Sequence, residues 1–131
     1  MKIAAAVRNS SAAHEVHVTT NGVTQALPVA AKSAGKGSSV NGGEFLMLAL
    51  ATCYCNDVYR EAERMQVPVE GVYVEASADF PGPGLAATNI RYFARITSSA
   101  PDDVIAELLR QTDAVAEVQS TLRSGARVHF E

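Results

Sequence analysis

The chain has 131 residues, of which 47% are hydrophobic and 19% are charged, and its formal net charge is −3 at pH 7. This length predicts a single domain over residues 1–131, and the composition is typical of a globular protein rather than a disordered one. Because the net charge is negative and the basic residues are scattered, we expect no binding to nucleic acid or to an anionic membrane.

The first third of the chain has the pattern of a small antiparallel sheet. Residues 2–7 form a short apolar stretch, and apolar residues alternate with polar ones from His14 onward. Asn21-Gly22 is a strong hairpin signal, so residues 23–30 are predicted to return as a strand. The charged start of the chain does not fit a secretory signal, and we expect a cytoplasmic protein.

A loop rich in glycine and serine, residues 32–43, leads to the next element. It contains Gly35-Lys36-Gly37-Ser38, which superficially matches the end of a phosphate-binding loop. The required earlier glycine is missing, and no convincing strand leads directly into the segment. The pattern therefore favours a simple connection over a nucleotide site.

A long helix is predicted from Glu44 to Gln66, because neither glycine nor proline interrupts this segment. Apolar residues cover most of the circumference from Phe45 to Cys55, which predicts burial on all sides there. The second half turns amphipathic. The apolar run is far shorter than the roughly 20 residues that span a bilayer, so we expect no membrane insertion.

The rest of the chain predicts a hairpin, one or two helices and a last strand. Residues 72–80 and 90–97 alternate between apolar and polar and are joined by a Pro-Gly loop. Helix signals begin at Ser99, and Thr112-Asp113 could start a second helix. Residues 126–131 are predicted as a final strand. The fold class is α+β, in the order β-β-β-α-β-β-α(α)-β.

The segment from Asn41-Gly42-Gly43-Glu44 to Ala51-Thr52-Cys53 resembles the first cysteine motif of the OsmC/Ohr family. The order of the predicted elements matches that family along nearly the whole chain. The resemblance implies an OsmC-like fold and an intertwined homodimer, with thiol-bearing helices at the centre and antiparallel sheets around them. For active members it also implies thiol-dependent reduction of organic hydroperoxides in oxidative stress.

Cys53 is the candidate nucleophile, although a buried cysteine is more often an inert packing residue. It lies too far along the helix for the helix dipole to activate it, so a cation must come from elsewhere. The resemblance implies an arginine of the N-terminal sheet, held by a glutamate at the helix start. Arg8 and Glu44 are the candidates here. The commonest family glutamate falls at Gly43, and Glu44 is equally well explained as a first-turn acid.

The resemblance also implies a second, resolving cysteine on the last helical segment, and this chain has none there. The corresponding position is near Ala116. Cys55 cannot replace it easily, because residues two apart on a helix project about 200° apart. A one-cysteine cycle with an external thiol, acting on a small hydroperoxide, is therefore the leading hypothesis. The alternatives are a non-catalytic dimer that binds an apolar small molecule in the same pocket, and a redox sensor.

No cofactor or metal is expected. The three histidines, His14, His17 and His129, and the two cysteines match no zinc-site spacing. We expect the partners to be a second copy of the chain and a small hydrophobic molecule or hydroperoxide.

Overall fold

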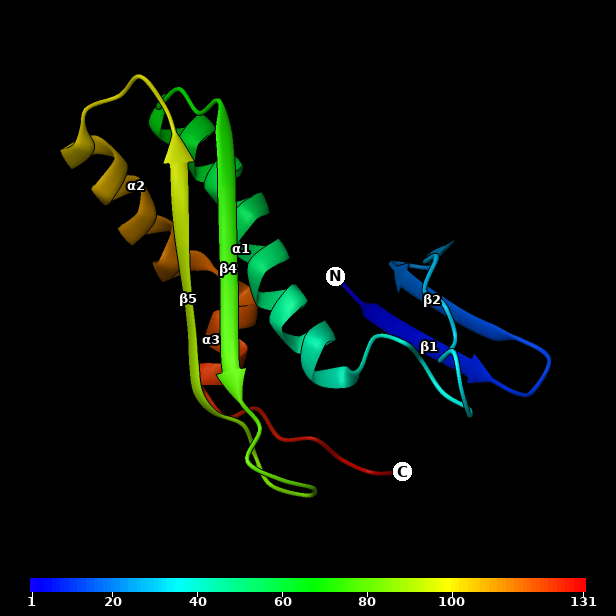
Figure 1. Ribbon diagram of the computed structural model, residues 1–131. Coiled ribbons are helices and arrows are strands. Elements are labelled where there is room, and N and C mark those ends of the chain that lie inside the picture. The colour runs from blue at the N-terminus through cyan, green and yellow to red at the C-terminus, as the bar shows by residue number, and fades with distance from the viewer. The chain divides into compact units, whose positions relative to one another are not determined.

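The computed structural model describes residues 1–131 (Figure 1). Its elements follow one another in the order β-β-β-α-β-β-α-α, as expected for an α+β protein up to the last helix. They are β1 (Ile3–Asn9), β2 (His14–Thr20), β3 (Val23–Ala26), α1 (Gly42–Met65), β4 (Gly71–Asp79), β5 (Thr88–Thr97), α2 (Asp102–Val115) and α3 (Glu117–Arg123).

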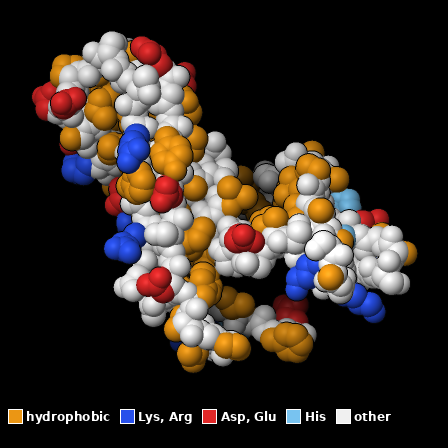
Figure 2. Space-filling view, viewed as in Figure 1, with side chains coloured by type: hydrophobic (Ala, Val, Ile, Leu, Met, Phe, Trp, Pro, Cys, Tyr) orange, Lys and Arg blue, Asp and Glu red, His pale blue; other side chains and the backbone are white.

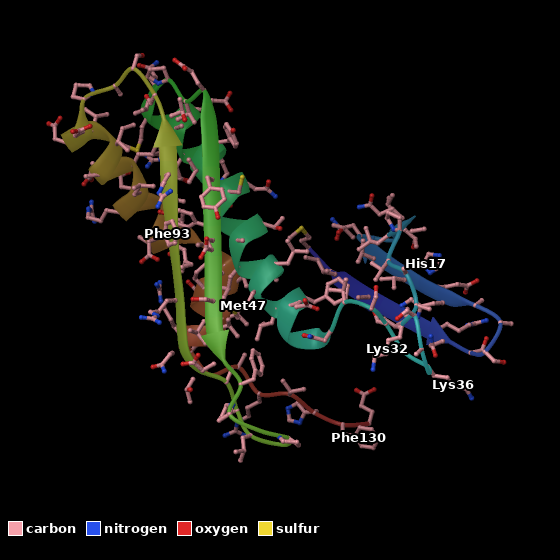
Figure 3. The ribbon with its side chains drawn as sticks, in the orientation of Figure 1. His17, Lys32, Lys36, Met47, Phe93 and Phe130 are labelled. Atoms are coloured by element: carbon pink, nitrogen blue, oxygen red, sulfur yellow. The ribbon has the colours of Figure 1, made fainter.

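The predicted final strand is wrong for this structure. Residues 126–131 have no regular secondary structure, and the side chains of Val128 and Phe130 are 96% and 105% exposed. Phe130 lies near the end of this extended segment (Figure 3). An alternating pattern makes a strand only when a neighbouring strand supplies the backbone hydrogen bonds, and no strand pairs with this segment.

The chain divides into two compact units, Met1–Phe45 and Leu46–Glu131. The N-terminal unit contains the antiparallel sheet β1-β2-β3, in which Ile3 is paired with Thr20. Its predicted hairpin is present, since Asn21 and Gly22 both have positive φ, at 49° and 83°. Val16 is the one buried residue of this sheet, so neither of its faces is packed as a hydrophobic core.

Helix α1 begins with a capping box. The Asn41 side chain accepts a hydrogen bond from the Glu44 backbone N–H at 2.9 Å, and the Glu44 carboxylate accepts one from the Asn41 N–H at 2.8 Å. These two bonds satisfy N–H groups that have no partner within the helix. They explain why the glycine-rich loop gives way to a helix at this point.

In the single chain, the expected burial of the first half of α1 is met only in part. In the apolar stretch from Phe45 to Cys55, only Leu50 and Tyr54 are buried, and Leu48 is 56% exposed. The second half has the buried stripe, with Val58 and Ala62 almost fully covered. Helix periodicity predicted an apolar face correctly, but it could not tell which part the other elements of this chain cover.

The hydrophobic core belongs to the C-terminal unit and lies between α1, the hairpin β4–β5 and α2 (Figure 1). Alternate residues of the hairpin, from Val72 to Val74 and from Tyr92 to Ile96, pack against it, and Leu108 of α2 is fully buried. The rings of Tyr54 and Tyr92 meet edge to face with centroids 4.8 Å apart. The Tyr54 hydroxyl donates to the Leu109 carbonyl at 2.7 Å, which ties α1 to α2.

A second helix does follow α2, but it begins four residues after the expected break. Thr112 is buried inside α2 and donates to the Leu108 carbonyl at 2.7 Å. The chain instead turns at Ala116, whose backbone is extended at φ −71° and ψ 112°. None of the three helices has the length and hydropathy that crossing a membrane would require.

The core assignment can be tested with Leu108→Ala. We expect the free energy of unfolding to fall by about 2–5 kcal/mol, because a fully buried leucine leaves a cavity when truncated. The control is Leu85→Ala, since Leu85 is 62% exposed and its truncation should change stability little. Urea denaturation at one protein concentration measures both. Equal effects of the two substitutions would contradict the core described here.

Candidate functional site

Cys53 lies on the face of α1 that meets the junction between α2 and α3. On this face Asp57 follows one turn later, and its Oδ2 lies 3.6 Å from the Cys53 sulfur. From the junction, Glu117 brings its Oε2 within 3.9 Å of the same sulfur. The thiol hydrogen therefore points toward carboxylate acceptors, and Cys53 is a half-buried hydrogen-bond donor.

Arg60, two turns after Cys53, holds these two carboxylates together. Its Nη1 lies 3.1 Å from Asp57 Oδ1 and 3.8 Å from Glu117 Oε1. Asp57 is only 5% exposed, so its charge needs a partner, and the guanidinium supplies one. The cation nearest in the chain to the thiol is thus engaged with acids in this structure.

The electrostatics of the cluster keep the thiol protonated. Burial is the main cause that raises the pKa of Cys53 above its ordinary value, and the charges of Asp57 and Glu117 add to the rise. A hydrogen bond from the Val118 backbone acts in the opposite direction, because it stabilises the thiolate. Burial likewise raises the pKa of Asp57, although Arg60 opposes that rise.

The same atoms could hold a metal ion in principle. The ligand atoms of Cys53, Asp57 and Glu117 all lie within 4.8 Å of one another. None of the three histidines belongs to this group. The Arg60 guanidinium already provides positive charge to both carboxylates, so the geometry does not require a metal.

Cys55 lies on another side of α1, as the helix geometry predicted. It lines a shallow depression formed by α1 and β4, together with Ala51, Thr52, Asn56 and Val72 to Val74. Cys53 instead packs against the core near the α2–α3 junction. A bond between the two sulfurs would require α1 to unwind.

Ala116 lies at the junction beside the thiol cluster and is completely buried. It immediately precedes Glu117, whose carboxylate reaches the Cys53 sulfur. The position predicted for the missing resolving cysteine is therefore next to residues that contact Cys53. An alanine side chain there offers no group that could react with an oxidised sulfur.

Arg8 and Glu44, the other two predicted site residues, belong to the N-terminal unit. Arg8 lies on β1, opposite Glu15 of β2 in the sheet register. The Glu44 carboxylate takes part in the capping box described above. Their participation in a site with Cys53 stays a prediction.

Arg60 and Glu117 were missed by the sequence reasoning. Arg60 could have been found, because the spacing of three, four and seven residues puts Cys53, Asp57 and Arg60 on one helix face. Glu117 gave no such signal, since its position depends on how the α2–α3 junction packs against α1.

Comparison with known proteins adds a family match to this geometry. A family model described as "OsmC-like protein" matches residues 35–131, which is more than half of the chain. No curated protein matches the chain in sequence.

Several solved structures share the fold at low sequence identity. An organic hydroperoxide resistance protein OsmC from Legionella pneumophila has a TM-score of 0.62 at 15% identity, covering 94% of this chain and 90% of its own. An OsmC-like protein from Mycoplasma pneumoniae has a TM-score of 0.64 at 15% identity, covering 93% and 86%. An OsmC-like hydroperoxide resistance protein from a Jannaschia species has a TM-score of 0.56 at 14% identity, covering 98% and 87%.

The role of Asp57 in keeping the thiol protonated can be tested by alkylation. In a Cys55→Ser background, Asp57→Asn should speed the reaction of Cys53 with iodoacetamide roughly two- to fivefold near about pH 8. Removing the carboxylate charge lowers the thiol pKa, so more thiolate is present at that pH. Glu63→Gln, at an exposed acid of the same helix, is the control and should have little effect. A slower reaction of Asp57→Asn would contradict this electrostatic account.

Proposed function

Because this chain belongs to the OsmC-like protein family, a family linked to organic hydroperoxide resistance, we propose that Cys53 reduces small organic hydroperoxides in a one-cysteine cycle. The observation that carries the proposal is the position of Cys53. It is the thiol of the segment that resembles the family motif, and it lies half-buried at the α2–α3 junction. The completely buried Ala116 supports a cycle without an internal resolving thiol.

In the proposed reaction, the Cys53 thiol loses its proton to water, since the Asp57 carboxylate beside it opposes ionisation. The thiolate attacks the terminal oxygen of the hydroperoxide, an S–O bond forms and the O–O bond breaks. A proton from water then neutralises the leaving alkoxide as an alcohol. The sulfur is oxidised to a sulfenic acid, and two equivalents of an external small thiol reduce it, releasing water and a disulfide.

This chemistry needs a cation that stabilises the thiolate, since the pKa of Cys53 is raised rather than lowered. Arg8, with Glu44 holding it, keeps the role implied by the family resemblance. Arg60 is a second candidate, because it already lies between the two acids that surround the thiol. Replacing each arginine by methionine and comparing the rate of hydroperoxide reaction identifies which one is used.

The raised pKa also favours a second function in which Cys53 does not react. A protonated, half-buried thiol is a weak nucleophile and a good apolar wall. In that case the protein would bind an apolar small molecule without chemistry. A slow, stoichiometric oxidation of Cys53 would instead fit a redox sensor.

We propose further that the working protein is a homodimer. In the single chain Val23 of β3, Leu48 of α1 and Val128 near the end are more than half exposed. Figure 2 shows hydrophobic side chains exposed on the visible face of the molecule. A sheet without a packed face and an apolar helix half are typical of a surface that another copy covers. The second copy is the occupant that family membership supports.

The thiol cycle can be tested with cumene hydroperoxide followed by peptide mapping. We expect sulfenic or higher oxidation at Cys53 first and no disulfide between Cys53 and Cys55, because the two residues lie on different sides of α1. Cys55→Ser should react like the wild type, and Cys53→Ser should lose the reaction. Adding a small thiol should return oxidised Cys53 to the reduced state.

Ala116→Cys provides the gain-of-function arm of the same experiment. Its new thiol should trap the sulfenic acid as an internal disulfide with Cys53, since Ala116 belongs to the core cluster against which Cys53 packs. Fast multiple turnover of the wild type through a Cys53–Cys55 disulfide would defeat the one-cysteine proposal. Equal inertness of both cysteines would favour the binding function.

The dimer can be tested by light scattering coupled to gel filtration. We expect a mass of two chains at micromolar concentration and a melting temperature that rises with protein concentration. Leu48→Glu should weaken the dimer by at least about tenfold, because it places a charge in the buried interface. Glu63→Gln serves as the control on the same helix. A monomer whose melting does not change on dilution would contradict the proposal.

A further inference from the structure

Asp57 and Glu117 each divide their two carboxylate oxygens between the thiol and an arginine. Asp57 Oδ2 and Glu117 Oε2 lie 3.6 and 3.9 Å from the Cys53 sulfur. Their other oxygens, Oδ1 and Oε1, lie 3.1 and 3.8 Å from Arg60 Nη1. The sulfur is therefore in contact with the two acids, whereas the guanidinium contacts the oxygens that the sulfur does not.

The charged groups connected to the thiol have a negative excess. Arg60 also lies 3.7 Å from the Glu61 carboxylate, and Arg64 lies 2.6 Å from the same carboxylate. Three acids and two arginines thus form one cluster, made of Asp57, Glu61, Glu117, Arg60 and Arg64. All of them belong to the C-terminal unit, so this balance of charge is a property of that unit alone.

Glu117 is the acid of this cluster that solvent reaches. Its side chain is 70% exposed, whereas those of Asp57 and Glu61 are 7% and 8% exposed. Cys53 is half-buried, so a molecule that reaches its sulfur also comes close to the Glu117 carboxylate. Charges at such short range change the local concentration of a charged reagent several-fold. The charge of a reagent should therefore influence how fast Cys53 reacts with it.

We propose that Glu117 is a specificity-determining residue, through which Cys53 selects cationic and neutral molecules over anionic ones. The consequence for the hydroperoxide cycle rests on the function proposed above. There the preferred substrate is an uncharged alkyl hydroperoxide rather than one that carries a carboxylate. The preferred external reductant is a thiol without net negative charge, because it must reach the same sulfur to form the mixed disulfide and release water.

The test uses two methanethiosulfonates on the full-length Cys55→Ser protein, in which Cys53 is the only thiol. One reagent carries a trimethylammonium group and the other a sulfonate. In both reactions the thiolate attacks the sulfur that bears the charged group, a disulfide forms and methanesulfinate leaves. The readout is the ratio of the cation rate to the anion rate, divided by the same ratio for 2-mercaptoethanol. Because one thiol takes part in both reactions, its thiolate fraction cancels from the ratio.

We expect the ratio to favour the cation by about fivefold at low salt. Glu117→Gln should lower it about threefold, because one negative charge is removed, and Arg60→Met should raise it by a similar factor. Glu63→Gln, at an exposed acid of the same helix, is the control and should leave the ratio unchanged. Raising the salt from about 0.05 M to about 1 M should bring the ratio close to that of 2-mercaptoethanol.

Three results would overturn the proposal: no preference at low salt, an unchanged ratio in Glu117→Gln, or no reaction of Cys53 with either reagent in the folded protein. A preference for the anion would also overturn it, since a cation from outside the cluster would then outweigh the acids. Neither reagent requires hydroperoxide chemistry. Failure of Cys53 to reduce cumene hydroperoxide would therefore count against the proposed cycle and not against selection by charge.

Discussion

The contact between α1 and the α2–α3 junction is the interaction on which the surroundings of Cys53 depend. It brings the Glu117 carboxylate to the Cys53 sulfur and seats Gln119 against the Leu50 carbonyl. Because Ala116 is completely buried at the junction, the two segments approach closely. The same contact thus half-buries the Cys53 thiol. It also buries Gln119 Oε1, which has no hydrogen-bond partner.

Burial at this contact lowers the reactivity of the Cys53 thiol, because it favours the protonated form. A half-buried thiol next to two acids resists ionisation, so nucleophilic attack requires a cation that outweighs them. Arg60 already neutralises part of that acidity. A reactive thiol at this position therefore needs more positive charge beside Cys53 than Arg60 supplies in this structure.

Apolar side chains are exposed in both units of the chain, because few other elements of the chain cover them. The N-terminal sheet has one buried residue, Val16, and the first half of α1 is covered only in part. Such surfaces are stabilised when another layer packs on them.

Periodicity, turn chemistry and helix-forming residues determined most of the secondary structure from the sequence alone. The Asn21-Gly22 turn, the length of α1 and the alternation in β4 and β5 depend on neighbours in sequence, and each was predicted. The motif around Cys53 likewise indicated the family that residues 35–131 match. Only the tertiary structure decided which part of α1 is buried, that Glu117 reaches the thiol and that Gln119 Oε1 lacks a partner. These features arise from contacts between residues more than sixty positions apart in the chain, which local patterns do not encode.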